Sequence, residues 1–132
     1  MDIRYEYDAP LRAEELSAVF RKSGIKRPYD DLDRLSRMID CADLTITAWD
    51  GEKLVGLARA ITDFAYCCYL SDLAVDADYQ RQGIGAELVR LLRDRLGDQV
   101  SLVLLSAPGA IDYYPRIGFE KSDKAFIIPR AR

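Results

Sequence analysis

The spacing of hydrophobic positions in the first forty residues changes from a strand period to a helix period. Residues 3–8, IRYEYD, alternate apolar and polar side chains, which is typical of a half-buried strand. From Pro10 to Lys22 the apolar positions recur every three or four residues, and Gly24 follows as a stop signal. Residues 32–39 repeat the helical spacing. The pattern therefore predicts one strand followed by two amphipathic helices.

Strand patterns dominate the middle of the chain. Residues 45–49 and 53–61 are two predicted strands, and the Asp50-Gly51 pair between them is a strong hairpin signal. Residues 66–75, YCCYLSDLAV, predict a third and longer strand. The first two of these strands are therefore expected to form a hairpin.

The last third returns to alternating elements. A helix is predicted over residues 83–96, and the nearly uniform apolar run at 100–107 indicates a strand covered on both faces. A short helical stretch near 110–117 and a closing strand at 125–129, AFIIP, complete the pattern. The predicted order is β-α-α-β-β-β-α-β-α-β-β, which favours a mixed α/β sheet of about 6–7 strands with helices on both faces.

Composition limits the class of protein. The 132 residues form one predicted domain, residues 1–132, with 31% charged and 49% hydrophobic side chains. No apolar run approaches the roughly 20 residues that span a bilayer, and the N-terminal sequence lacks a signal-peptide pattern. A net charge of −3 argues against nucleic acid as the main partner. We expect a cytoplasmic protein without a nucleic-acid or membrane partner.

Two residue counts exclude whole classes of chemistry. The chain has no histidine, which removes mechanisms that depend on imidazole, including Ser-His-Asp triads and His-ligated zinc. Its three cysteines, Cys41, Cys67 and Cys68, have no metal-ligand spacing, so free thiols and no metal are expected.

The clearest candidate for chemistry is the stretch YQRQGIGAEL at 79–88. It places Gly83 and Gly85 at the start of the predicted helix, where main-chain N–H groups lack partners inside the helix. Glycines let a bulky anion approach those groups, and the helix dipole favours negative charge there. A tight strand-to-helix turn is the alternative explanation. Neither the P-loop pattern nor the G-x-G-x-x-G dinucleotide fingerprint is present.

Two motifs together resemble one family. Gln80-x-x-Gly83-x-Gly85 after a long strand resembles motif A of the GNAT superfamily, the acetyl-CoA-dependent N-acetyltransferases. The segment YYPRIGF, residues 113–119, is similar to the Y-x-x-x-GF segment that follows the next strand in that family. The element order also matches, so the resemblance implies a GNAT-like, mostly antiparallel central sheet.

The resemblance assigns acetyl-CoA to one strand and the turn after it. The main-chain groups of the strand would pair with the pantetheine arm like an added strand, and the turn would wrap the pyrophosphate. The positions implied for the cofactor are Leu73, Ala74, Val75, Arg81, Gln82, Gly83, Ile84, Gly85 and Ala86.

The same resemblance implies the catalytic roles. Tyr114 matches the tyrosine that protonates the leaving thiolate, although a shift of one residue would select Tyr113 instead. The N–H of Val75 is the expected donor to the carbonyl oxygen. Asp72 is the candidate base, either facing the acceptor cleft or the helix side.

Several points stay open at this stage. Asp112 and Asp63 are alternatives to Asp72 as base. Pro115 directly after Tyr114 predicts a short or irregular helix there, and the loop SAPGA lacks the asparagine that many members of the family carry.

The implied function is direct transfer of an acetyl group from acetyl-CoA to a primary amine of a small molecule or peptide. A non-catalytic acyl-CoA sensor and a transferase for another acyl-CoA are the alternatives. Many relatives dimerise, so a homodimer is one arrangement that the resemblance allows. The amine acceptor does not follow from the sequence.

Overall fold

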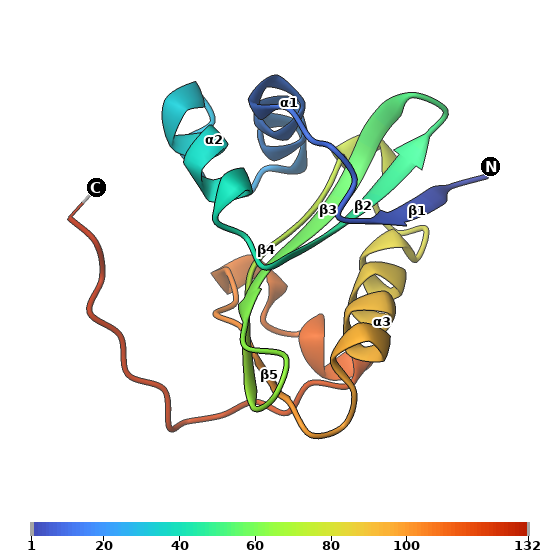
Figure 1. Cartoon of the computed structure of the whole chain (residues 1–132). Coiled ribbons are helices and arrows are strands. Elements are labelled where there is room, and N and C mark those ends of the chain that lie inside the picture. Colours follow the sequence, from blue (N-terminus) through green and yellow to red (C-terminus); the bar gives the residue numbers. More distant parts are fainter. Residues whose placement is uncertain (1, 132) are drawn as a thin grey trace.

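A five-stranded sheet in the order β1-β2-β3-β4-β5 forms the middle layer of the computed structural model, which describes residues 2–131 (Figure 1). The strands are β1 (Arg4–Tyr7), β2 (Leu44–Asp50), β3 (Lys53–Thr62), β4 (Cys67–Val75) and β5 (Ser101–Val103). The strands β1 to β4 pair with one another antiparallel, and β5 pairs parallel with β4. The sheet is therefore mixed and mostly antiparallel, as expected.

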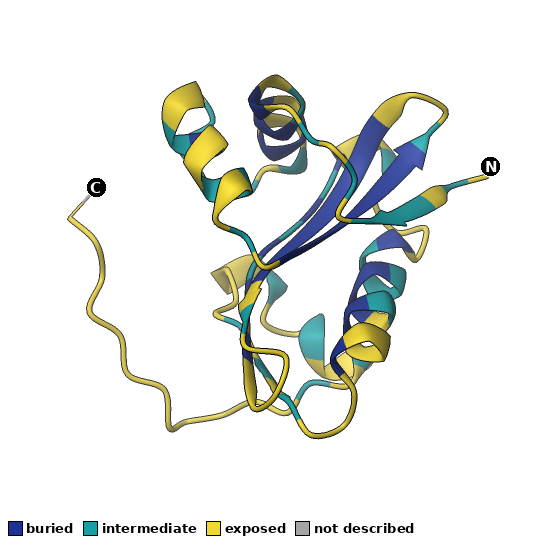
Figure 2. Cartoon of the chain, in the orientation of Figure 1, coloured by how far each residue is buried: buried dark blue, intermediate teal, exposed yellow. Residues whose placement is uncertain are grey.

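Helices cover both faces of this sheet (Figure 1). The helices α1 (Ala13–Ser23) and α2 (Leu32–Asp40) pack on one face, and α3 (Ile84–Leu96) packs on the other. Short 3₁₀ turns are η1 (Ala77–Tyr79), η2 (Pro108–Ala110) and η3 (Tyr114–Ile117). Two hydrophobic cores result, one on each side of the central strands, which are buried along most of their length (Figure 2).

Local signals set the ends of α1 and α2. The Arg12 main-chain N–H donates to the Glu15 carboxylate at 3.0 Å, and Gly24 ends α1 in the left-handed conformation with φ of 82°. At the start of α2, the Asp31 carboxylate accepts a hydrogen bond from the Arg34 N–H at 3.1 Å. These caps fix where the segment between the two helices begins and ends.

A glycine on β3 allows α3 to start close to the sheet. A Cβ atom at Gly56 would lie 3.1 Å from Ile84 Cγ2 and 3.4 Å from the carbonyl oxygen of Ala74. Real Cβ atoms rarely come this close to a neighbour, so a side chain here would push the first turn of α3 away from β4. Gly56 thus helps to place the turn that carries the two motif glycines.

The last two strands of the sheet, β4 and β5, pair over only three residues. The β4–β5 ladder joins Cys67, Cys68 and Tyr69 to residues 101–103, whereas β4 continues to Val75. Beyond Tyr69, the edge of β4 that faces β5 has no strand partner among residues 2–131. A gap therefore opens between β4 and the segment after β5.

For the first hundred residues, the predicted strands and helices are confirmed, and each predicted end lies within three residues of the observed one. The strand expected at 100–107 is wrong in length, because only residues 101–103 pair, and its side chains alternate in exposure instead of being covered on both faces. The strand expected at 125–129 is also wrong, since residues 120–131 form no helix or strand. The sheet has five strands instead of six or seven because those residues do not pair with it.

Within residues 2–131, no helix has both the length and the apolar character needed to cross a bilayer. That same part of the chain holds no group of His, Cys, Asp or Glu side chains arranged to bind a metal ion.

Candidate functional site

The turn before α3 presents main-chain N–H groups that no side chain caps with a hydrogen bond. Gly83 is the N-cap residue in the left-handed conformation, with φ of 85°, and no side chain caps the helix. The first N–H with a partner in the helix is that of Glu87, which donates to the Gly83 carbonyl at 3.0 Å. The N–H groups of Ile84, Gly85 and Ala86 precede it, so they remain available to an anion at the positive end of the helix dipole.

The side chains of the turn leave this helix start open. Arg81, Gln82 and Gly83 are exposed, and Arg81 has φ of 65°. A non-glycine residue with this φ is uncommon, and here it turns the chain sharply into the helix. The turn therefore has the geometry of an anion cradle built from main chain.

Gln80, the first residue of the motif, has a structural role. Its side-chain amide donates to the Val75 carbonyl at 2.8 Å and to the Ser23 carbonyl at 3.3 Å. It joins the end of β4 and the end of α1 to the turn, instead of pointing to the cradle.

One acidic side chain in the first turn of α3 is neutralised. Arg90 binds Glu87 through two hydrogen bonds of 2.8 and 2.7 Å, and this contact lowers the pKa of Glu87. Without that partner, the carboxylate would oppose an anion at the start of the helix.

The end of β4 supplies an extended main-chain edge beside the cradle. The Asp76 N–H donates to Val55 on β3 at 2.8 Å. Because main-chain groups alternate along a strand, those of Leu73 and Val75 point away from β3, toward the gap. Ala74 is different, since its main chain faces β3 and its side chain is buried in the core beneath α1 and α2. Of the three expected β4 positions, Leu73 therefore offers its main-chain groups and Val75 its N–H, since the Val75 carbonyl already accepts from Gln80.

Tyr113 is a site residue that the motif alone did not select. A Cβ atom at Gly85 would lie 2.8 Å from the Tyr113 hydroxyl and 3.9 Å from Val75 Cγ2. The phenol thus rests against the bare main chain at the start of α3, beside the end of β4. Burial raises the pKa of Tyr113, so its hydroxyl keeps its proton at neutral pH.

The Tyr114 ring packs against the rings of Tyr113 and Phe119. Its ring makes edge-on contacts with Tyr113, at 5.3 Å between centroids, and with Phe119, at 5.5 Å. Burial, and to a smaller degree the neighbouring Tyr113, raise the pKa of Tyr114, while the positive charge of Arg27 opposes them. As Pro115 predicts, the segment is only a 3₁₀ turn.

The structure does not favour Asp72 as a base. Its side chain is completely buried on the side of α1 and α2, where one carboxylate oxygen accepts from Arg27 and the other from Arg59. A second Arg27 nitrogen donates to the Ser71 carbonyl at 2.7 Å. With both oxygens in ion pairs and no exposed surface, the carboxylate has no path to an incoming ammonium group. Asp72 instead holds the segment between α1 and α2 to the sheet, through its ion pair with Arg27.

The two alternative carboxylates, Asp112 and Asp63, both lie in exposed turns. Asp112 is exposed, in the turn before Tyr113. Asp63 accepts hydrogen bonds from the N–H groups of three residues of its own turn, at 2.8–3.1 Å: Ala65, Tyr66 and Cys67. These bonds lower the pKa of Asp63 to about 2 and hold the turn between β3 and β4.

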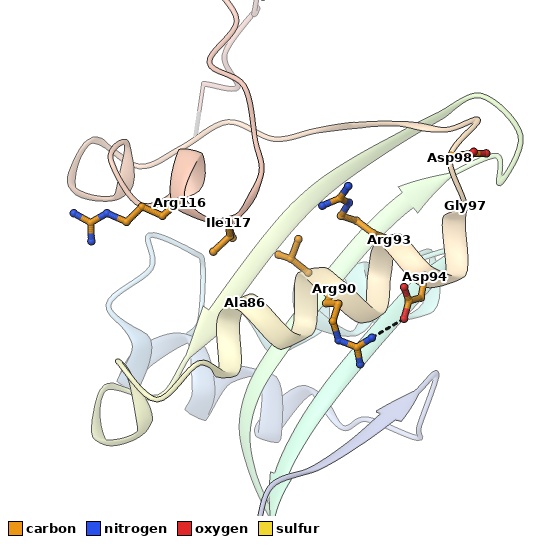
Figure 3. A pocket seen from close by; sticks show the side chains of 9 residues that line it. Ala86, Arg90, Arg93, Asp94, Gly97, Asp98, Arg116 and Ile117 are labelled. Atoms are coloured by element: carbon orange, nitrogen blue, oxygen red, sulfur yellow. Dashed lines mark hydrogen bonds and ion pairs between the residues drawn. The ribbon is translucent and has the colours of Figure 1, made fainter.

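A hollow lined by arginines and by two aspartates, Asp94 and Asp98, extends from the cradle along α3. A cavity of about 770 Å³ lies between α3 and η3, and it is lined by Ala86 at one end and Gly97 at the other. Three arginines, Arg90, Arg93 and Arg116, also line it (Figure 3). Arg90 is held by Glu87 and by Asp94, at 2.8 Å. Arg93 has no ion-pair partner among residues 2–131 and points toward the η3 side of the cavity (Figure 3).

Comparison with known proteins agrees with this geometry. The model of the acetyltransferase (GNAT) family matches residues 10–119. The chain belongs to this family. The GCN5-related N-acetyltransferase 2, chloroplastic, of Arabidopsis thaliana is 40% identical over 78 residues, which are 54% of this chain and 30% of that protein. The chain therefore spans less than a third of this relative.

Solved structures share the GNAT fold over nearly the whole chain. A probable acetyltransferase from Staphylococcus aureus has a TM-score of 0.83 at 21% identity, covering 98% of this chain and all of the other. The aminoglycoside N-acetyltransferase AAC(6')-Iy, solved in complex with CoA, has a TM-score of 0.70 at 12% identity, covering 99% and 96%.

Replacing Asp72 by Asn should cost stability without changing the pH dependence of turnover. The substitution leaves two partly buried guanidinium groups without a charge partner, so we expect a loss of about 3 kcal/mol in the free energy of unfolding. Urea unfolding measures this loss. The matched control is Asp94→Asn, which breaks an exposed pair and should cost less than about 1 kcal/mol. A stable Asp72→Asn protein with a lost ionisation in its pH–rate profile would restore Asp72 as the base.

The contact between Gly85 and Tyr113 separates two explanations of the glycine. We expect Gly85→Ala to weaken CoA binding at least tenfold in calorimetry, and Tyr113→Phe added to it to restore little. The methyl group would obstruct an anion at the cradle as well as the phenol. Gly109→Ala is the control, since a Cβ there meets nothing within 4 Å. Full recovery in the double variant would mean that Gly85 only makes room for the tyrosine.

Proposed function

We propose that the chain transfers an acetyl group from acetyl-CoA to a primary amine of a small molecule or peptide. The observation that carries the proposal is the uncapped start of α3 beside the free edge of β4. Leu73 and Val75 offer main-chain groups to an extended chain, and the next residues along the path, 84–86, offer N–H groups to phosphate oxygens.

The residues present fit this cofactor. The cradle has no Cβ at Gly83 or Gly85, the Glu87 carboxylate is paired with Arg90, and a cavity lined by three arginines and two aspartates continues from Ala86. When bound, the cofactor supplies an activated acyl group as a thioester. We assign its pyrophosphate to the cradle and its phosphorylated adenosine to the cavity between α3 and η3.

Within the reaction, we assign the proton donor to Tyr114 and the carbonyl-oxygen donor to the Val75 N–H. The raised pKa of the Tyr114 phenol keeps it protonated at neutral pH, so it can give a proton or hydrogen bond to the departing thiolate. The Val75 N–H points into the gap, where it can stabilise negative charge on the attacked carbonyl. The proposal assigns no side chain as base, because Asp72 is enclosed by Arg27 and Arg59.

The acceptor side lies at the segment between α1 and α2. Arg27 from this segment extends to Asp72 and influences Tyr114, so the segment borders the space where an amine would approach. The solved neighbours include aminoglycoside acetyltransferases, and a relative from Glycine max is named a histone acetyltransferase. A small amine and a lysine side chain are thus both reasonable acceptors to assay.

The direct test is thiol release from acetyl-CoA in the presence of amino acids, polyamines, amino sugars, arylamines and peptides, with mass spectrometry of the product. We expect thiol release that depends on one class of amine and an acetylated amine of matching amount. Binding of acetyl-CoA without release for any amine would instead indicate a sensor. Faster release from propionyl-CoA or succinyl-CoA would identify another acyl donor.

Replacing each tyrosine by Phe distinguishes their roles. We expect Tyr114→Phe to lower kcat about 100-fold with an unchanged KM for acetyl-CoA, because general acid catalysis typically contributes at least this much. Tyr113→Phe is the matched control, and we expect it to raise KM with little change in kcat, since its hydroxyl lies at the cradle. Steady-state kinetics measure both, and the reverse pattern would transfer the acid role to Tyr113.

Removing the Arg93 guanidinium should affect the cofactor through its 3′-phosphate. We expect Arg93→Ala to raise KM about tenfold for acetyl-CoA and to leave KM for acetyl-dephospho-CoA nearly unchanged. Arg95→Ala, on the same helix but outside the cavity, is the control. An equal effect on both cofactors would exclude a phosphate contact.

A further inference from the structure

The 3₁₀ turn η1 joins the end of β4 to the turn that leads into the cradle, residues 80–83. It is only three residues long, and Asp76 alone separates it from Val75, the last residue of β4. In the proposed function, one cofactor contacts main chain on both sides of η1, first along β4 and then at residues 84–86. The position of η1 therefore determines whether the two binding surfaces fit the same molecule.

Tyr79, the last residue of η1, is tied to a hairpin that is distant in the sequence. Its hydroxyl donates a hydrogen bond of 2.5 Å to the carboxylate of Asp50, the last residue of β2. Its ring packs against the core on the α3 side of the sheet. The hydrogen bond to Asp50 raises the pKa of Tyr79, so the phenol keeps its proton, and with it this bond, at neutral pH. The end of η1 is thus held to the β2–β3 hairpin.

Lys53 links the same hairpin to the start of η1. It pairs with Asp50 across the hairpin, so both residues lie at its tip. The Lys53 ammonium group lies 5.1 Å from the centroid of the Tyr79 ring and 3.6 Å from a carboxylate oxygen of Asp76. Asp76 is 1% exposed, and its other carboxylate oxygen accepts from the Asp78 N–H at 2.9 Å. Two residues of the hairpin therefore hold both ends of η1.

The turn after η1 depends on such anchors because it is exposed. Residues 80–83 all lie at the surface, and Arg81 has a positive φ of 65°. A non-glycine residue in this conformation costs free energy, which the contacts around it must offset. Gln80 supplies two hydrogen bonds, to the ends of β4 and α1. The hydrogen bond from Tyr79 holds the residue directly before it, so it fixes the point from which the turn begins.

We propose that Tyr79 is a positioning residue for the cofactor, because its hydrogen bond to Asp50 holds the turn at 80–83 in the form that binds the pyrophosphate. The inference rests on the proposed function, and Tyr79 acts through the turn instead of by contact with the cofactor. Without the hydrogen bond, the turn exchanges between this form and others. The apparent affinity for the cofactor then falls in proportion to the fraction of molecules in the binding form. The loss therefore appears in cofactor affinity and not in the chemical step.

Calorimetry with CoA and with 3′-dephospho-CoA tests this role. We expect Tyr79→Phe to weaken the binding of both about fivefold, because both carry the pyrophosphate and the turn would adopt the binding form about a fifth of the time. The value of kcat at saturating acetyl-CoA should not change. Tyr7→Phe is the matched control. It removes a phenol hydrogen bond of 2.9 Å to the Leu91 carbonyl, further along α3, and should leave both affinities unchanged.

Substitutions of Asp50 test the other partner of the hydrogen bond. Asp50→Ala should weaken CoA binding as much as Tyr79→Phe does, whereas Asp50→Asn should retain most of the affinity, because an amide oxygen still accepts the bond. The double variant Tyr79→Phe/Asp50→Ala should bind like either single variant, since both remove the same interaction. Losses that add in the double variant contradict the proposal. Circular dichroism checks that each variant folds, and the two Asp50 variants carry the same comparison if Tyr79→Phe does not fold.

The outcomes separate this inference from the proposed function. Unchanged affinity in Tyr79→Phe, or an equal loss in Tyr7→Phe, overturns the role of Tyr79. A loss for CoA alone overturns it as well, because the effect would then lie at the 3′-phosphate. If the unsubstituted chain binds neither CoA nor 3′-dephospho-CoA, the proposed function fails and the inference fails with it. If that chain binds both and the variants bind equally well, only the inference is lost.

Discussion

The short pairing of β4 with β5 is the constraint on which the rest of the structure depends. Three residue pairs hold β5 to the sheet, after which β4 continues alone to Val75. The unpaired end of β4, with its free main-chain groups, lies beside the turn that starts α3. On its far side, β5 is left with an open edge. One local feature of the sheet thus creates both the candidate cofactor path and the open outer edge of β5.

Main chain, more than charged side chains, defines the electrostatics at the start of α3. The cradle depends on N–H groups and the helix dipole, and the Glu87 carboxylate in the first turn is held by Arg90. Gly56 on β3 and Gly85 on α3 have complementary roles in this arrangement, since one lets the helix approach the sheet and the other leaves space above the helix start. Gln80 then secures the turn to two carbonyl groups, at the ends of β4 and α1.

Much of this arrangement follows from the sequence, because it depends on local patterns. The hairpin at Asp50-Gly51, the long strand to Val75 and the helix after Gly83 are all encoded in residue spacing and turn chemistry. The environment of Asp72 could not be predicted, since its two partners come from a segment 45 residues earlier and from a neighbouring strand. The position of Tyr113 against Gly85 likewise depends on how a 3₁₀ turn packs, which no periodicity describes.

The C-terminal segment illustrates a different limit of sequence reasoning. AFIIP has the composition of a strand, and the pattern predicts one at 125–129. A strand needs a partner as well as a propensity, and residues 125–129 pair with none of the five strands. The pattern describes what the segment can form, whereas the pairing decides whether it forms.

The way in which Asp72 holds the α1–α2 segment has an evolutionary consequence. Arg27 holds the segment to the sheet through the buried Asp72, and Ile25 and Tyr29 pack against the core, while Lys26 and Asp30 are exposed. Substitutions at the two exposed positions leave that anchor and the main-chain cradle untouched. Selection can therefore alter the surface beside the proposed acceptor space through a few codons, with the cradle inherited unchanged.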